Sequence, residues 1–311
     1  MRLFIIVAAG LLTAAVPAQR AIAQGAPADA CKARYVTNDE RLAGCTAMIE
    51  AKTETGRSLA VAYCNRGFVL TEKKELDRAL ADLEAAIKLD PSYACSFSNR
   101  GRVFAFKGDL EKAIADYDRA IKLDPKFATA YNNRGDALMR RGEFDKAIED
   151  FTTAIKHDSK NVNAYGNRAW AYQRKRDYNR ALADYSKTIE LEPDDLLGYI
   201  NRGNVHRAMN NLDRAAADYG EAIRVAPTDA RGWRNRGMIK LMKYDNAGGI
   251  ADYNKAIEYD PKDAYSWNNR GLAKKDVGDK AGAIADFKKA LEISPNMPST
   301  RQLLKELGAS P

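Results

Sequence analysis

The sequence has few cysteines and histidines, the side chains that most often bind zinc and other transition metals. Among 311 residues there are only four cysteines and two histidines, and no Cys-x-x-Cys or His-Glu-x-x-His motif occurs. His157 and His206 stand far apart, without a nucleophile at matching positions. The glycines recur at intervals and do not cluster as a phosphate-binding loop. The sequence therefore favours a non-catalytic protein with no metal and no cofactor.

Dense basic runs, which bind nucleic acid, are also missing. The formal net charge is +8, from 50 basic and 42 acidic side chains. Such an excess favours anionic partners only weakly, and the alternative interpretation is a solvated surface of mixed sign. The charged fraction of 30% and the hydrophobic fraction of 45% are typical of a well-packed, helix-rich chain. We expect no specific nucleic-acid ligand.

The first residues have the pattern of a signal peptide. Met1-Arg2 is a short basic start, Leu3–Val16 is an almost uninterrupted apolar run, and Ala21-Ile22-Ala23 is a small-x-small cleavage site. The apolar run is short for a bilayer span. We predict a signal peptide at residues 1–23 and an exported protein, periplasmic in a Gram-negative host or secreted, with no membrane insertion after cleavage. The alternative is an uncleaved membrane anchor.

The cysteines lie close together in the sequence. Cys31, Cys45, Cys64 and Cys95 all fall in the first third of the expected mature chain. An even number of cysteines in an oxidising compartment favours disulfides, and four cysteines permit three pairings. The alternative is that they are free, small hydrophobic side chains.

A triplet returns every 34 residues. Asn-Arg-Gly begins at residues 65, 99, 133, 201, 235 and 269, and Asn167-Arg168-Ala169 fills the remaining place. A fixed period of this length indicates one supersecondary structure that buries its apolar face by stacking on the next copy. The seven copies are 60–93, 94–127, 128–161, 162–195, 196–229, 230–263 and 264–297.

Each copy reads as two helices joined by a turn. In the third copy, Tyr131, Gly135 and Leu138 mark one apolar face, and Phe151 with Ala154 marks a second. In most copies a proline stands two residues before the end of the copy and terminates the second helix, because proline cannot continue a helix. These prolines are Pro91, Pro125, Pro193, Pro227, Pro261 and Pro295.

These positions resemble the tetratricopeptide repeat. In the third copy the family pattern is matched by an aromatic residue at the fourth place, glycine at the eighth, small residues at the twentieth and twenty-seventh, and an aromatic residue at the twenty-fourth. They are Tyr131, Gly135, Ala147, Ala154 and Phe151. Thr188 departs from the pattern, because it replaces a small residue. The resemblance implies an all-α fold, a right-handed α-solenoid of seven helix-turn-helix repeats over 60–297.

Both ends of the array are expected to be capped. Residues 24–59 resemble an N-terminal cap that contains a degenerate half-repeat, and residues 298–311 resemble a C-terminal capping helix and tail. Aligned on the repeats, Cys64 and Cys95 face the same side of neighbouring first helices. We therefore predict the disulfides Cys31–Cys45, which would hold the end cap, and Cys64–Cys95.

The arginine of the triplet departs from the family, which commonly has leucine there. An aspartate follows each arginine sixteen residues later, across the hairpin turn. An arginine on the first helix could therefore meet an aspartate on the second helix of its own or of a neighbouring repeat. We predict a ladder of structural ion pairs, and the alternative is that the arginines bind a ligand. The representative pairs are Arg100 with Asp116, Arg134 with Asp150, and Arg202 with Asp218.

The resemblance also implies a concave groove lined by the first helices. Amides at the sixth place could hold a peptide backbone, or could only solvate the groove. We expect Trp170, flanked by arginines, to be the main anchor. The expected contacts with a partner are Asn99, Arg102, Asn133, Arg140, Asn167, Trp170, Arg174, Asn201, Asn204, Arg207 and Asn235.

The predicted function is a protein–protein interaction scaffold that binds a peptide or helix of another protein in this groove. One alternative is a structural adaptor of an envelope assembly that uses the convex face and the ends of the array. Another is a weak binder of an anionic polymer.

Overall fold

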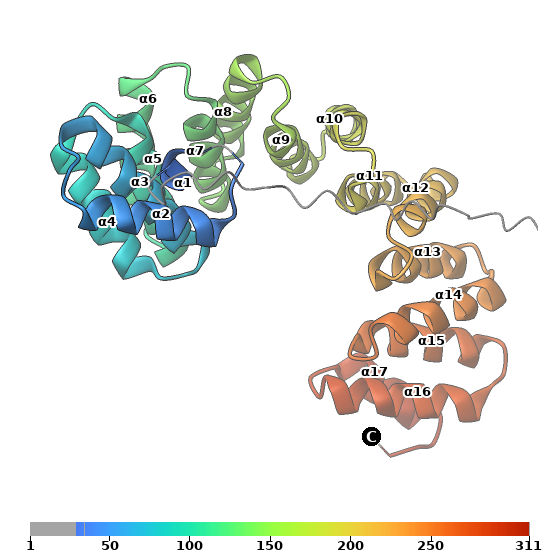
Figure 1. The fold of residues 1–311 in the computed structure, drawn as a ribbon. Coiled ribbons are helices and arrows are strands. Elements are labelled where there is room, and N and C mark those ends of the chain that lie inside the picture. Colours follow the sequence, from blue (N-terminus) through green and yellow to red (C-terminus); the bar gives the residue numbers. More distant parts are fainter. Residues whose placement is uncertain (1–28, 34, 311) are drawn as a thin grey trace, which may run out of the picture. The chain divides into compact units, whose positions relative to one another are not determined.

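The structure, a computed structural model, describes residues 29–33 and 35–310. All regular elements in these ranges are helices, seventeen in number, and no strand occurs among them. The fold is an all-α solenoid of helix-turn-helix repeats (Figure 1). Two compact units are distinguished, the first ending at Pro91 and the second beginning at Ser92. The predicted signal peptide, residues 1–23, lies outside the described residues.

The first unit contains the predicted N-terminal cap and the first hairpin. Its helices are α1 (Asp29–Lys32), α2 (Asn38–Glu50), α3 (Gly56–Glu72) and α4 (Leu76–Leu89). α2 begins with a capping box, in which the backbone N–H of Glu40 donates to the Thr37 hydroxyl and that of Thr37 donates to the Glu40 carboxylate. A Cys31–Cys45 disulfide joins α1 to α2. The Asn65 amide on α3 donates to the carbonyl of Cys31 over 2.9 Å, so α3 is tied to the same corner.

The second unit is built from hairpins that follow one another along the chain. Its helices are α5 (Ala94–Lys107), α6 (Leu110–Leu123), α7 (Ala128–Arg140), α8 (Phe144–His157), α9 (Val162–Arg174), α10 (Tyr178–Leu191), α11 (Leu196–Ala208), α12 (Leu212–Val225), α13 (Ala230–Met242), α14 (Asn246–Tyr259), α15 (Ala264–Asp276), α16 (Lys280–Ile293) and α17 (Pro298–Glu306). Each helix from α5 to α17 packs on the next (Figure 1). First helices of successive repeats also lie next to each other, as α7 and α9 do, and α9 and α11 have fewer close backbone approaches than the other such pairs of this unit.

The small residues of the repeat allow the two helices of a hairpin to cross. A Cβ atom added at Gly135 would lie 2.7 Å from the ring of Phe151, well inside van der Waals contact. Ala147 and Ala154 on the facing helix are fully buried, and so is Phe151. The aromatic ring therefore occupies the space that the missing side chain leaves, and a larger residue at Gly135 would push the helices apart.

The turn inside each hairpin needs a left-handed backbone. At the fifteenth place of the repeat, φ is positive in all seven copies. Three copies have glycine at this place, as at Gly142 (φ 83°), and four have other residues, among them Tyr244 (φ 63°). Only glycine adopts this conformation without a steric penalty. The non-glycine turns therefore carry backbone strain.

The end of the array is covered by α17. Leu304 on this helix is buried against Ala283 and Phe287 of α16. The last hairpin would otherwise expose this apolar face to water, because no further repeat stacks on it. Along the described part of the chain, no helix combines the length and the apolar character needed to cross a bilayer.

Candidate partner-binding face

Each arginine of the triplet binds the aspartate sixteen residues on, which lies on the second helix of its own repeat. In the third repeat, Arg134 Nε and Nη2 donate to the two carboxylate oxygens of Asp150 over 2.8 and 2.6 Å. The aspartates are only 2–7% exposed, so the pairs are shielded from solvent. The seven pairs are Arg66–Asp82, Arg100–Asp116, Arg134–Asp150, Arg168–Asp184, Arg202–Asp218, Arg236–Asp252 and Arg270–Asp286.

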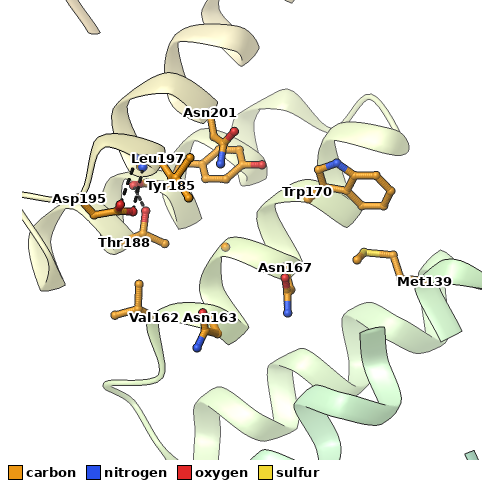
Figure 2. Close-up of a pocket in the computed structure, with 12 residues that line it drawn as sticks. Met139, Val162, Asn163, Asn167, Trp170, Tyr185, Thr188, Asp195, Leu197 and Asn201 are labelled. Carbon is orange, nitrogen blue, oxygen red and sulfur yellow. Dashed lines mark hydrogen bonds between the residues drawn. The ribbon is translucent and has the colours of Figure 1, made fainter. Parts of the chain in front are cut away.

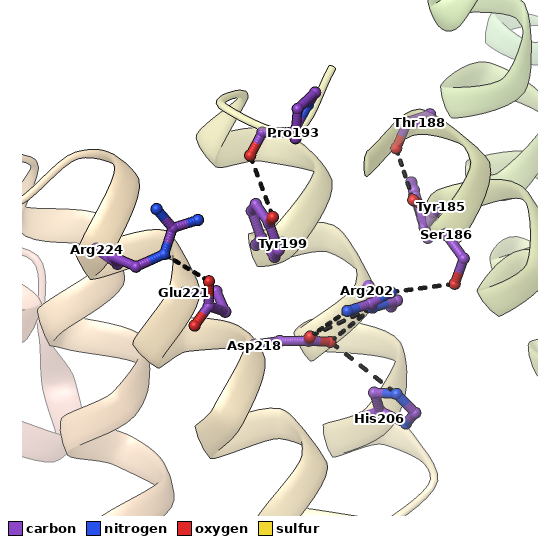
Figure 3. Close-up of polar contacts among 10 residues, drawn as sticks. All are labelled: Tyr185, Ser186, Thr188, Pro193, Tyr199, Arg202, His206, Asp218, Glu221 and Arg224. Carbon is purple, nitrogen blue, oxygen red and sulfur yellow. Dashed lines mark hydrogen bonds and ion pairs between the residues drawn. The ribbon is translucent and has the colours of Figure 1, made fainter. Parts of the chain in front are cut away.

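Several of these arginines also reach the preceding repeat. Figure 3 shows Arg202 between Asp218 of its own repeat and Ser186, sixteen residues before it. Equivalent contacts join Arg134 to Asp118, Arg168 to Thr152 and Arg270 to Asn254. One guanidinium thus links the second helices of two consecutive repeats. The sequence left open whether the partner lies in the same or a neighbouring repeat, and the structure shows contacts of both kinds.

The same arginines stack on the aromatic residue three positions earlier. The guanidinium carbon lies 4.7–5.7 Å from the ring centroid in six repeats. The hydrogen bonds to Asp150 raise the pKa of Arg134 further above its ordinary value. With its fork bound to a carboxylate and its plane covered by a ring, this arginine has a structural role. The geometry favours the ion-pair ladder over the ligand-binding alternative.

The opposite surface of the first helices carries the predicted contact residues, and we call it the first-helix face. Its amides at the sixth place of the repeat differ in their partners. Asn167 donates to Asn132 over 3.2 Å, and Asn269 donates to the hydroxyl of Tyr253 over 3.2 Å. In the described part of the chain, the side chains of Asn133, Asn201 and Asn235 form no hydrogen bond with protein atoms. Those three half-buried amides keep both donor and acceptor capacity for a ligand.

The larger cavity of this face lies between α9 and α11 and measures about 310 Å³. Figure 2 shows Trp170 and Met139 at one end, with Leu197, Val162 and Thr188 at the other. The amides of Asn163, Asn167 and Asn201 stand around the opening. The cavity therefore combines apolar walls with amide groups at its rim, an arrangement common in sites that bind ligands.

A second cavity of about 160 Å³ adjoins the first through Asn167, which lines both. Arg102, Asp136 and Arg140 contribute its charges, and Phe106 contributes a ring beneath Arg102 at 5.5 Å. Burial raises the pKa of Asp136 above its ordinary value, and the charge of Arg140 opposes this rise. The second cavity is thus lined by charged side chains.

Trp170 does not have all the arginine neighbours that we expected. Arg174 lies over its ring at 5.2 Å and over the ring of Phe144 at 5.7 Å. Arg140 instead donates to the carbonyl of Ala105 over 3.0 Å. Arg207 likewise points to another repeat, where its Nη1 lies 3.0 Å from the sulfur of Met238.

The remaining predicted contacts are spread along this face. Asn204 accepts a hydrogen bond of 2.8 Å from the hydroxyl of Tyr219. The Asn99 amide lies 3.6 Å from the sulfur of Cys95. With these internal partners, Asn204 and Asn99 have less capacity for a ligand than Asn133 or Asn201.

Two residues that shape the larger cavity were missed in the sequence. Gly166 occupies the fifth place of its repeat, and a Cβ there would meet only the methyl of Thr188, at 3.9 Å. Leu197 is 46% exposed although it is a large apolar residue. A signal was present, because Gly166 is the one glycine at the fifth place and Thr188 departs from the family pattern. That Gly166 on α9 and Thr188 on α10 line the same cavity could only be seen in the structure.

The histidines have structural surroundings. His157 stacks on Tyr131 with ring centroids 6.0 Å apart. His206 is buried, and its Nε2 lies 4.0 Å from Asp218 (Figure 3). Burial lowers the pKa of His206, because charging the ring is unfavourable there. Over the described residues, no group of three or more His, Cys, Asp or Glu side chains is arranged to hold a metal ion.

One of the two predicted disulfides can be described. Cys31 and Cys45 are bonded, with their Cα atoms 4.5 Å apart. Cys64 belongs to the first unit and Cys95 to the second, so their pairing stays a prediction. Export stays a prediction as well.

These features define a helical-hairpin repeat protein with two adjoining cavities on its first helices. Models of the tetratricopeptide repeat match residues 60–93, 128–161, 162–195, 200–243 and 264–297, and a TPR repeat model matches 101–142. The chain belongs to the tetratricopeptide repeat family. Such repeats generally form non-catalytic scaffolds that bind other proteins. No match is found among curated proteins.

Solved structures share this fold. The chain resembles a chain of the APC/C hetero-tetramer Cut9-Hcn1 with a TM-score of 0.62 and 19% identity, over 87% of its own length and 52% of that chain. It thus spans about half the length of that relative. A tetratricopeptide repeat protein from Parabacteroides merdae gives 0.58 and 23%, over 80% and 98% of the two chains. YrrB, described as having an unusual peptide-binding site, gives 0.51 and 22%, over 62% and 97%.

Proposed function

We propose that this chain is a non-catalytic scaffold that binds an extended segment of a partner protein on its first-helix face. The observation that carries the proposal is the pair of adjoining cavities, with the apolar walls of one open to solvent. Trp170 and Leu197 are 38% and 46% exposed there. Large apolar side chains left open beside a cavity are typical of interaction sites.

The amide groups support an extended peptide as the ligand. Asn133 and Asn201 retain hydrogen-bonding capacity at the two cavities, one on α7 and one on α11. An amide side chain can donate to a peptide carbonyl and accept from a peptide N–H, whatever the sequence of the ligand. A scaffold of this kind holds the peptide backbone through amides and selects its side chains through cavities.

The proposal is tested by capturing partners from the native envelope fraction with chemical cross-linking. We expect the combined substitutions Trp170→Ala, Arg140→Ala and Arg174→Ala to remove most of the captured partner, because truncating an anchor residue typically costs more than about 2 kcal/mol of binding free energy. The matched control is Lys122→Ala with Lys156→Ala, which removes the same charge from exposed positions on second helices.

Equal capture by the triple variant and the unchanged chain would contradict the proposal. It would favour the structural adaptor, which uses the other faces of the array. Binding that falls steeply as salt is raised, in the control as well, would instead favour an anionic polymer.

A further inference from the structure

We propose that the larger cavity is an anchor subsite for one bulky apolar side chain of the partner peptide, and that the charged cavity beside it selects an acidic residue nearby in the same peptide. This inference rests on the proposed function, because it specifies the ligand of the same face. The expected ligand is an extended peptide with an apolar residue and a carboxylate about three to six residues apart. That separation corresponds to one or two helix spacings of about 8–10 Å at about 3.3 Å per extended residue.

The apolar subsite exists because two residues are unusual. At the fifth place of the repeat, Gly166 brings no side chain to the surface, and the nearest atom to an added Cβ would be the Thr188 methyl at 3.9 Å. Thr188 is buried and turns its hydroxyl to the carbonyl of Tyr185 over 2.8 Å. Its methyl group is therefore available to the cavity. The floor of the subsite is apolar although a threonine forms it.

The cavity lies between the first helices of two repeats. α9 and α11 have fewer close backbone approaches than the other adjacent first helices of the second unit. At the far side, Gly198 packs tightly, since an added Cβ would lie 2.9 Å from Ile189. The cavity is thus a gap between two fixed walls, and its volume of about 310 Å³ is at the lower end of the range for ligand sites. This size suits a side chain better than a large cofactor.

The polar atoms of the subsite favour a peptide over a free apolar molecule. The Asp195 carboxylate is already used, because it accepts hydrogen bonds from the backbone N–H groups of Leu197 and Gly198. Asn163, Asn167 and Asn201 surround the opening with amides. Asn167 already donates to Asn132, whereas peptide groups flanking the inserted side chain could bind the amides of Asn163 and Asn201, and a hydrocarbon ligand could not.

The preference for an acidic neighbour follows from charge. Arg140 is exposed and uses one Nη atom on the Ala105 carbonyl, so other guanidinium donors face solvent. Asp136 lines the same cavity. Burial raises the pKa of Asp136, which favours its neutral form beside Arg140. A carboxylate on the peptide complements the guanidinium of Arg140.

The test uses a random peptide library and the full chain without its predicted signal peptide. Peptides selected by the chain are sequenced, and their affinities are measured by fluorescence anisotropy. Three variants are compared. Gly166→Leu fills the cavity from a position where a Cβ fits, Gly166→Ala gains helix propensity but leaves most of the cavity open, and Gly220→Leu makes the same substitution on α12, where an added Cβ meets nothing within 4 Å.

We expect selected peptides to share an apolar residue and an acidic residue at the stated separation. Gly166→Leu should weaken their binding at least about tenfold, which corresponds to losing the burial of one apolar side chain. Gly166→Ala, which fills only part of the cavity, should weaken it less than Gly166→Leu does, and Gly220→Leu should change it less than about threefold. Arg140→Glu should weaken acidic peptides about tenfold more than their amide versions.

The outcomes separate this inference from the proposed function. A library that yields no binding peptide overturns both. Peptides that bind but lack the shared pattern, or that bind Gly166→Leu with unchanged affinity, overturn the subsite and leave peptide binding in place. Loss of binding in Gly220→Leu as well as in Gly166→Leu, with both variants folded by circular dichroism, also overturns the subsite, because the effect is then not local.

Discussion

At the scale of single residues, the arginine of the triplet contributes more contacts than a side chain at a helix surface usually does. Arg134 binds Asp150 with two hydrogen bonds, reaches Asp118 of the preceding repeat, and covers the ring of Tyr131. A leucine at this place could pack on the ring but could not bridge two carboxylates. The arginine therefore adds a directional contact between repeats to the usual apolar packing.

We expect Arg134 and Asp150 to be strongly coupled. In a double-mutant cycle with Arg134→Leu and Asp150→Ala, the coupling free energy of unfolding should be about 1–3 kcal/mol, because the carboxylate is nearly buried and the fork is bidentate. Urea unfolding of the four proteins measures it.

The exposed pair Lys289 and Glu292 provides the control for this cycle. Its coupling should not exceed about 0.5 kcal/mol, as for other surface pairs. The structural role of the ladder would be refuted if the coupling of Arg134 with Asp150 were as small as that of the control.

The single-residue features differ in how far the sequence predicts them. A constant offset of sixteen indicates the Arg–Asp contacts, and all seven form. The arginine–aromatic stacking was not foreseen, although the two residues stand three positions apart on one helix face. The split among the sixth-place asparagines could not be foreseen, because it depends on side chains of other helices, such as Asn132 for Asn167 and Tyr253 for Asn269.

At the scale of the hairpin, the internal turn is the element under strain. Its left-handed residue is followed by the residue that caps the N-terminus of the second helix. In the sixth repeat this is Asp245, whose side chain accepts a hydrogen bond from the backbone N–H of Gly248. Tyr244 just before it is 90% exposed, so its ring adds little packing to compensate for its φ of 63°.

We expect Tyr244→Gly to stabilise the chain. Relief of the left-handed strain, about 1–2 kcal/mol, should exceed the entropy that glycine adds to the unfolded chain, about 0.4–1 kcal/mol. Thermal unfolding followed by circular dichroism measures the change. In the reverse direction, Gly142→Ala should destabilise the equivalent turn of the third repeat. A fall in stability for Tyr244→Gly would show that the turn is not strained.

The helices themselves follow from local sequence. Apolar spacing predicts both helices of each repeat, and the prolines between copies predict where second helices end. The cavity between α9 and α11 is different in kind. Gly166 and Thr188 both line it, and single-sequence reasoning does not show which side chains of neighbouring helices would fill such a space.

At the scale of the whole molecule, repetition fixes the frame and leaves the first-helix face free to vary. The ladder, the crossings and the turns recur in every repeat, whereas Trp170, Gly166 and Leu197 occur once each at their places. Function therefore has to be argued from the positions that break the repeat. They lie in the fourth and fifth repeats of the chain, 162–195 and 196–229, where they line the larger cavity.

The most direct test of this account is where the partner touches the chain. A photo-reactive residue placed at Asn163 stands on the first-helix face at the cavity rim, and the same residue placed at Gly220 stands on a second helix with open space around it. With a peptide selected by the unchanged chain, we predict an abundant cross-link at position 163 and almost none at position 220. Cross-linking mainly at position 220 would contradict binding on the first-helix face.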